Sequence, residues 1–327
     1  MKMKAAWLRG LRRFEIAEID VPEIEPRQVL VKVLKVAICG SDRGMWNGHH
    51  FFNDLYDWDD FAPGEHGHEA SGVVVELLMN VRTGPLSKKE VRQAIAYTVD
   101  RKRLIETAFL GLGKPAASIM HSGLKPFYTD QVPQYAYDAE KANKLLDAAG
   151  FPKKADGTRF KLRLVWATGR EVETAAAEVI RNQLKQVGVD VELQKLDRAA
   201  AIDKVYVKWD FDAAVWSLAT GPDPTLGVTR SYHTKRIEKI AFANSSGYSN
   251  PEADKLMDIE YLQPNEKERA AIWHRIQRIL LTDLPVYPLV EFPIANVYRK
   301  GYHNVVSHPA QASRYLGEAW MDNPGGK

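Results

Sequence analysis

Cysteine is almost missing from this sequence: Cys39 is the single cysteine among 327 residues. One thiol cannot close an internal disulfide, and it excludes structural zinc sites with two or four cysteines and thiolate-held iron–sulfur clusters. Long apolar runs are missing too. The longest ones, such as Val73–Val75 and Ile279–Leu281, fall far short of the ~20 residues that a membrane-spanning helix needs. We therefore expect no membrane span.

The sequence also lacks a strong excess of charge of either sign. Its 45 Lys and Arg residues nearly balance 42 Asp and Glu residues, which leaves a formal net charge of +3. Nucleic-acid-binding proteins usually carry clustered positive charge, so we expect no nucleic-acid partner. Near the start, Arg9, Arg12 and Arg13 interrupt the apolar stretch that a signal peptide would require. As written, the sequence predicts a cytoplasmic protein.

The composition is that of a globular protein, with 45% hydrophobic and 27% charged residues. The length fits about two domains of roughly 100–200 residues. β-branched and alternating patterns predict strands in the first third, and helices and strands alternate after it. The expected strands are 29–39, 70–76, 160–166, 189–196, 211–216 and 286–291. The expected helices include 101–110, 138–150, 171–187, 250–261 and 266–282. This alternation predicts an α/β or α+β fold.

Several of the expected helices have a recognisable first residue. Asp100 and Asn250 are side chains that commonly cap helix N-termini, and Pro251 follows Asn250 at a position where proline is favoured. Ser87 and Glu90 have the spacing of a capping box. The sequence therefore predicts helix starts at these three places.

Two short segments of the first third carry residues that can bind metal: Cys-Gly-Ser-Asp and His-Gly-His-Glu. A thiolate and an imidazole are good zinc ligands, and a catalytic zinc needs three protein ligands and one open position. Cys39 and His68 supply two ligands, and Glu69 or Asp42 would add an oxygen. The alternative is that Cys39 and His68 bind no metal, because two protein ligands rarely hold zinc.

Residues 1–77 resemble the start of the zinc-dependent medium-chain alcohol dehydrogenases, whose catalytic domain is GroES-like. The matching motifs are Met3-Lys4-Ala5-Ala6, Cys39-Gly40-Ser41-Asp42 and Gly67-His68-Glu69-Ala70-Ser71-Gly72. The resemblance implies that Cys39 and His68 bind a catalytic zinc beside the acidic Glu69. It also implies that Ser41 relays a proton from the alcohol.

The remaining parts of an alcohol dehydrogenase site are not recognisable in the sequence. No later segment supplies the family's third zinc ligand. No glycine-rich turn lies between a strand and a helix, as a nicotinamide site requires. We therefore expect zinc, if bound, at an incomplete site and no NAD site. Any enzymatic activity would be of the zinc-dependent alcohol dehydrogenase type.

Residues 78–327 resemble the C-terminal lobe of the family 5 extracellular solute-binding proteins, which deliver peptides, nickel complexes and other solutes to ABC importers. The matching segments include Asn80-Val81-Arg82-Thr83-Gly84-Pro85-Leu86, Val91-Arg92-Gln93-Ala94-Ile95-Ala96-Tyr97 and Gly247-Tyr248-Ser249-Asn250-Pro251. The resemblance implies an α/β lobe of the periplasmic binding protein type II fold. It also implies a small solute or peptide as ligand and an ABC permease as partner. Members of this family normally act in the periplasm or outside the cell.

The family resemblance places a ligand-facing loop directly after the strand 211–216, starting at Trp216. In the peptide-binding members an aspartate three positions after this tryptophan pairs with the peptide's amino terminus, and in this sequence that position is Ala219. The missing carboxylate puts peptide specificity in doubt. Trp216 is either a cleft residue or a buried strand residue. Asp223, which precedes Pro224, is either a ligand contact or a turn former.

Together the two resemblances predict a chain made of two incomplete parts, 1–77 and 78–327. The expected function is solute binding for an ABC importer, impaired because the family's first lobe is missing. One alternative is a zinc-dependent oxidoreductase with an incomplete site. The other is a non-functional fusion or misassembled reading frame, since a partial sheet leaves an unpaired edge.

Overall fold

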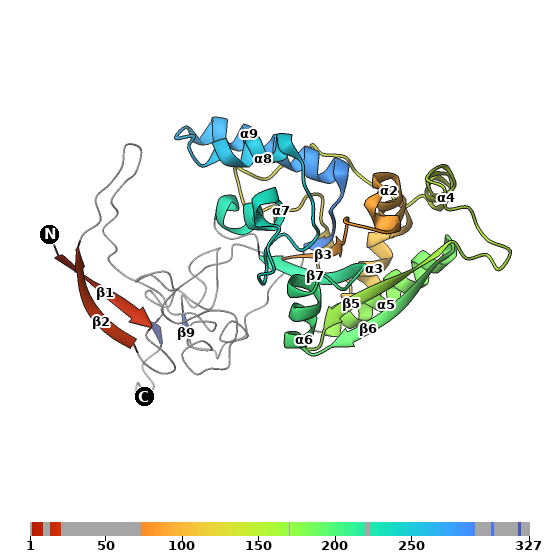
Figure 1. The fold of residues 1–327 in the computed structure, drawn as a ribbon, viewed down its shortest axis with the longest axis horizontal. Helices are drawn as coiled ribbons and strands as arrows, with labels where there is room; N and C mark the ends of the chain where they lie inside the picture. The colour runs from red at the N-terminus through yellow and green to blue at the C-terminus, as the bar shows by residue number, and fades with distance from the viewer. Residues whose placement is uncertain are drawn as a thin grey trace. The chain divides into compact units, whose positions relative to one another are not determined.

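The computed structural model describes residues 2–8, 14–20, 73–169, 171–219, 223–291, 302–303 and 320–321. The chain divides into two compact units: Met1–Glu69 together with Ala295–Lys327, and Ala70–Ile294. We call the second unit the lobe; it contains the large sheet and its helices (Figure 1).

The described parts of the first unit are two short strand pairs. β1 (Lys2–Leu8) pairs antiparallel with β2 (Phe14–Asp20), and β9 (Tyr302–His303) pairs with β10 (Trp320–Met321). These pairs alone do not identify a GroES-like fold. The GroES-like fragment expected from the sequence is therefore not shown by the structure.

The expected boundary between residues 77 and 78 falls inside β3 (Val73–Met79), a strand of the lobe. β3 pairs with β7 along its whole length and with β8 along most of it. Residues on both sides of the expected boundary thus form one continuous strand. Residues 295–327, which the sequence assigned to the second part, group with the first unit instead.

The lobe is built on a six-stranded mixed sheet with the order β4-β8-β3-β7-β5-β6. β5 runs parallel to both β6 and β7, whereas β3 runs antiparallel to both of its neighbours. The remaining strands are β4 (Lys114–Pro115), β5 (Phe160–Ala167), β6 (Val189–Leu196), β7 (Ala213–Ala219) and β8 (Val286–Glu291). This sheet with its helices confirms the α/β class predicted for this part of the chain.

Helices and single turns pack around the sheet (Figure 1). The longer helices are α2 (Lys89–Thr98), α3 (Arg101–Ala108), α4 (Ala139–Ala148), α5 (Glu171–Gln186), α8 (Pro251–Glu260) and α9 (Glu266–Asp283). The shorter ones are η2 (Pro85–Ser87), α6 (Arg198–Ile202), η3 (Asp203–Val207), η4 (Thr225–Thr229), α7 (Arg230–Tyr232) and η5 (Thr234–Arg236). In the part of the chain that the structure describes, no helix is both long and apolar enough to cross a membrane.

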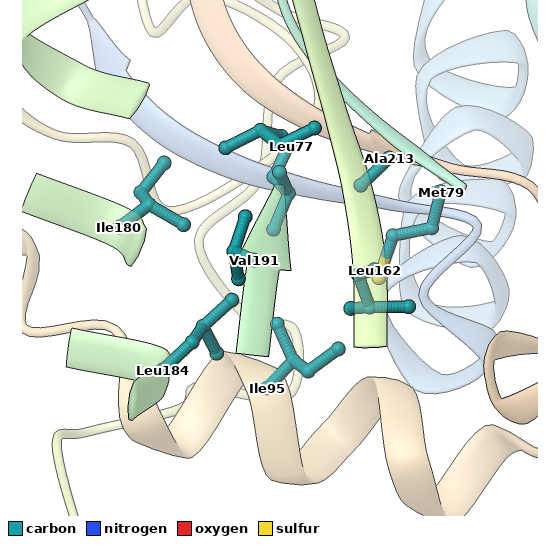
Figure 2. A pocket seen from close by; sticks show the side chains of 9 residues that line it. Leu77, Met79, Ile95, Leu162, Ile180, Leu184, Val191 and Ala213 are labelled. Carbon is teal, nitrogen blue, oxygen red and sulfur yellow. The ribbon is translucent and has the colours of Figure 1, made fainter. Parts of the chain in front are cut away.

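The apolar core between the sheet and the helices α2 and α5 follows from strand alternation. Successive side chains of a strand point to opposite faces, so Leu77 and Met79 share one face of β3. A cavity of about 10 Å³ remains there (Figure 2). Apolar side chains line it: Leu77, Met79, Ile95, Leu162, Leu164, Ile180, Leu184, Val191 and Ala213. A space of this size without polar partners does not stabilise a water molecule, so we interpret it as a packing defect.

Two of the three predicted helix starts are confirmed. The Asp100 side chain accepts hydrogen bonds from the backbone N–H groups of Lys102 and Arg103, and Asn250 caps α8 in the same manner. The prediction for Ser87 was wrong: α2 begins after Lys88 without a side-chain cap. Ser87 lies in the preceding turn η2, and its hydroxyl donates to the Gly84 carbonyl at 2.7 Å instead.

Candidate ligand-binding site

One edge of the sheet gathers the features that a binding site requires. Because β5, β6 and β7 run parallel, their carboxyl ends meet at this edge, where open α/β sheets bind ligands. Val73 at the start of β3 pairs with Ala219 at the end of β7. Val74 pairs with Glu291, the last residue of β8. The first strand of the lobe, β3, therefore starts at the sheet edge where ligand is expected, and its last strand, β8, ends there.

Trp216 occupies the middle of β7 and is buried, with 4% of its surface exposed. Its ring packs on Tyr206 of η3 at a centroid distance of 5.5 Å and on Phe242 at 6.5 Å. Tyr206 and Phe242 also contact each other, at 5.3 Å. The three rings form an aromatic cluster, so in this structure Trp216 has the surroundings of a buried strand residue.

The first turn of α5 is tied to the carboxyl ends of two strands. The Ser217 hydroxyl on β7 donates to Glu173 at 2.6 Å, and Glu173 is 4% exposed. The Trp166 indole on β5 donates to the Thr174 hydroxyl at 3.0 Å. Both bonds join a strand end to α5, so they fix the helix start at the edge where ligand is expected.

Asp223 follows β7 and is held by an ion pair with α9. Arg269 donates to both carboxylate oxygens of Asp223, each at 2.6 Å. The backbone N–H of Thr225 donates to Asp223 at 2.9 Å, which is the local bond of a turn-forming aspartate. Burial alone raises the pKa of Asp223, but the hydrogen bonds from Arg269 and Thr225 outweigh it and bring the pKa below its usual value. Asp223 is thus an ionised anchor in the lobe.

A second carboxylate lies on the other side of Arg269. The Nε of Arg269 donates to Glu260 at the end of α8, at 2.8 Å, and the side chain of Glu260 is fully buried. The Trp273 indole donates to the same oxygen of Glu260 at 2.9 Å. The hydrogen bonds that Arg269 donates to Asp223 raise its pKa most; burial lowers it, and the bond donated to Glu260 raises it further, so the pKa of Arg269 lies above its usual value. Arg269 therefore stays charged and joins α8, α9 and the segment after β7.

Glu76 is a buried carboxyl on β3, 1% exposed. Its Oε1 has no hydrogen-bond partner among the described residues. Burial raises the pKa of Glu76 to about 8, so the carboxyl is mostly protonated at neutral pH. Tyr206 and Tyr232 face it: their pKa values are raised by burial first and by the Glu76 charge second.

The residues expected to bind zinc, Cys39, His68 and Glu69, lie outside the described residues, as does Ser41. Within the described ranges, no group of three or more His, Cys, Asp or Glu side chains could hold a metal ion. The structure thus brings together Trp216 with the aromatic cluster and Asp223 with Arg269, and the zinc site stays a prediction.

A match to a family model shows which protein family this chain belongs to. The model of the bacterial extracellular solute-binding proteins, family 5 middle region, matches residues 55–239, more than half of the chain. The chain belongs to this family. The match begins inside the segment 1–77 that the sequence analysis assigned to an alcohol dehydrogenase-like fragment. The comparisons support the solute-binding family and do not support that fragment.

Proteins similar to this chain include relatives named for binding peptides. The oligopeptide-binding protein AppA of Bacillus subtilis is 31% identical over 217 residues, which are 63% of this chain and 38% of AppA. The glutathione-binding protein GsiB of Shigella flexneri is 24% identical over 231 residues, 68% of this chain and 43% of GsiB. The chain thus spans about two fifths of the length of these curated relatives.

Solved structures show the same fold. The structure of Bacillus subtilis AppA in complex with a nonapeptide matches with a TM-score of 0.67 and 25% identity, over 79% of this chain and 52% of AppA. This similarity confirms the expectation of a periplasmic binding protein fold for the lobe.

Three residues described above were not predicted from the sequence: Glu173 and Arg269 near this edge, and Glu76 in the middle of β3. Glu76 had a visible signal, because it is a charged residue within the otherwise apolar run of β3. Arg269 had none, since its partner Asp223 is 46 residues away in the sequence. Glu173 is likewise paired across 44 residues with Ser217.

Proposed function

We propose that this protein binds short peptides or peptide-like solutes as the solute-binding component of an ABC importer. The family match over residues 55–239 carries the proposal. The likeness of the fold to AppA in its nonapeptide complex supports it. An ABC permease is the proposed partner, and the proposed place of action is that of the family, outside the cytoplasm.

We place ligand contact at the carboxyl ends of β5 and β7 and on the segment after β7. Proteins of this architecture bury a ligand on nearly all sides by closing two lobes around it. We propose that the described lobe offers one of these faces.

Thermal denaturation of the full chain with added ligand tests the proposal. A ligand that binds only the folded state raises the melting temperature in a saturable manner. We expect such a shift with a nonapeptide or with glutathione. A cooperative melt that neither compound shifts, up to millimolar concentration, would reject peptide binding.

The position of Ala219 gives a sharper test of peptide recognition. If the segment after β7 holds a peptide's amino terminus, Ala219→Asp adds a carboxylate that pairs with the ammonium group. We expect Ala219→Asp to bind a nonapeptide more tightly than Ala219→Asn, which has the same shape without the charge. The gain should vanish with an N-acetylated nonapeptide. Equal affinities of the two variants would place the amino terminus elsewhere.

Zinc binding by Cys39, His68 and Glu69 stays a separate proposal that rests on the motifs alone. Metal analysis of the purified protein tests it together with the variants Cys39→Ser and His68→Ala. If the site forms, the wild type contains zinc and both variants lose it; if Cys39 and His68 bind no metal, none of the three proteins contains zinc. A wild-type protein without zinc and without NAD-coupled alcohol turnover ends the oxidoreductase alternative.

A further inference from the structure

Side chains of two helices, α5 and α9, hold the end of β7 and the segment that follows it. On the strand side, Ser217 donates to Glu173 of α5. Beyond the strand, Asp223 and Thr225 both bond to Arg269 of α9. These ties lie on either side of the position where the family resemblance places ligand contact.

Arg269 uses all three of its nitrogen atoms in this arrangement. Its two terminal nitrogens bond to the two oxygens of Asp223, and one of them also donates to the Thr225 hydroxyl at 2.5 Å. Its Nε donates to Glu260 at 2.8 Å. Only a planar guanidinium serves three acceptors in this fork geometry; a lysine ammonium is a single point charge.

Glu260, the carboxylate that accepts from the Nε of Arg269, is itself held in place by further hydrogen bonds. Glu260 is fully buried and accepts from Trp273 at 2.9 Å and from the Thr225 hydroxyl at 2.5 Å. The guanidinium also lies over the Phe127 ring, 4.8 Å from its centroid. A buried carboxylate with these partners leaves Arg269 little freedom to reorient.

We propose that Arg269 is a positioning residue that holds Asp223 and the turn η4 in the arrangement required for ligand contact. Asp223 then acts through its bond to Arg269 and not as a direct ligand contact. The inference deepens the proposed function and rests on it for the place of ligand contact. The fastening itself can be measured without any ligand.

Hydrogen–deuterium exchange of the full chain tests the fastening. We expect Arg269→Met and Asp223→Asn to speed amide exchange in residues 223–229 about tenfold, because each removes charged hydrogen bonds from this segment. The exchange rate of Arg269→Lys in this segment should be closer to that of Arg269→Met than to that of the wild type, because lysine restores the positive charge but not the planar guanidinium. The matched control is Arg275→Met: Arg275 also lies on α9 and pairs with an α8 carboxylate, Glu252, at 3.0 and 2.5 Å.

Three results would overturn the inference. One is exchange in residues 223–229 that stays within about threefold of the wild type in Arg269→Met. Another is an equal increase in Arg275→Met. The third is an increase spread evenly over α8 and α9, which would mean that Arg269 only stabilises the helices. If Arg269→Met does not melt cooperatively, Asp223→Asn decides the question by the same criteria.

A binding measurement separates this inference from the proposed function. With a nonapeptide as the probe, we expect Arg269→Met to lose at least about tenfold in affinity while Arg275→Met keeps the wild-type value. Unchanged affinity in Arg269→Met would overturn the positioning role. If the wild type itself binds no nonapeptide, the proposed function fails, and the exchange results still decide whether Arg269 fastens the segment.

Discussion

Glu76 of β3 and Trp216 of β7 are register partners in the middle of the sheet. Directly opposed residues of antiparallel strands point to the same face, so the carboxyl of Glu76 lies on the side where Trp216 packs on Tyr206. Burial on that side raises the pKa of Glu76 to about 8. The lobe therefore contains an acid that is mostly neutral at neutral pH in the folded state.

Glu76 should make the stability of the lobe depend on pH. With a pKa of 4.5 in the unfolded chain and about 8 in the folded one, the folded state alone keeps the proton between these values. The contribution of Glu76 to the free energy of unfolding is then fully present below pH 4.5 and is lost as the pH rises from 4.5 through about 8, by up to about 1.4 kcal/mol per pH unit. Glu76→Gln removes this loss.

Urea denaturation at about pH 5, 6.5 and 8 measures this effect. The advantage of Glu76→Gln over the wild type should grow with pH, whereas Glu90→Gln, at an exposed position on α2, should follow the wild type. A difference between Glu76→Gln and the wild type that stays constant across this range would contradict the assignment.

Leu162→Ala should be strongly destabilising because it enlarges the existing cavity beside β5. Leu162 is 3% exposed and lines that cavity (Figure 2). Removing its side chain loses buried apolar surface and adds empty volume, which costs about 2–5 kcal/mol. Leu110→Ala is the control, because Leu110 is 84% exposed. Equal losses in urea denaturation would show that Leu162 is not a core residue.

Gly113→Ala should destabilise the lobe more than Gly111→Ala. Both glycines have positive φ angles, 103° and 76°, so both alanines carry backbone strain of about 1 kcal/mol. At Gly113 the added Cβ would also lie 2.7 Å from the Glu291 carbonyl oxygen, whereas at Gly111 nothing lies within 4 Å. We expect an additional loss of about 1–3 kcal/mol at Gly113. Equal melting temperatures for the two variants would show that the end of β8 yields without cost.

Asp100→Ala should lower the free energy of unfolding by about 1 kcal/mol, because it removes the cap of α3. The Asp100 side chain accepts from two backbone N–H groups, at 3.0 and 3.1 Å. Asp100→Asn keeps an oxygen that accepts the same bonds, so most of the stability should return. If Asp100→Asn is as unstable as Asp100→Ala in urea denaturation, the charge of Asp100 matters and its cap does not.

Local signals explain which parts of the fold could be predicted from the sequence. Asp100 and Asn250 act on N–H groups two or three residues away, and the strands 189–196 and 286–291 were predicted with their observed bounds. Ser87 also had a local signal, but Pro85 begins a separate turn before α2. The competing turn took the Ser87 hydroxyl, so the prediction was wrong.

The sequence predicted which strand carries the candidate site, but it did not predict the contacts of the residues there. The pattern of β7 indicated a strand with Trp216 near its end, and the observed strand continues to Ala219. Whether Trp216 faces solvent depends on Tyr206 and Phe242, which reach it from other segments. The partner of Asp223 likewise comes from α9. Contacts between segments distant in the chain are not encoded in any local pattern.

The pairing of Val74 with Glu291 has a consequence for engineering. Backbone atoms of antiparallel register partners lie only about 5 Å apart, so the two connections of the lobe leave it through adjacent strands. A segment with neighbouring ends can be grafted into a surface loop of another protein without stretching its host. We therefore expect the lobe to fold when it is inserted into a host protein through the start of β3 and the end of β8. Because these two ends are close together, the insertion should cost little loop-closure entropy.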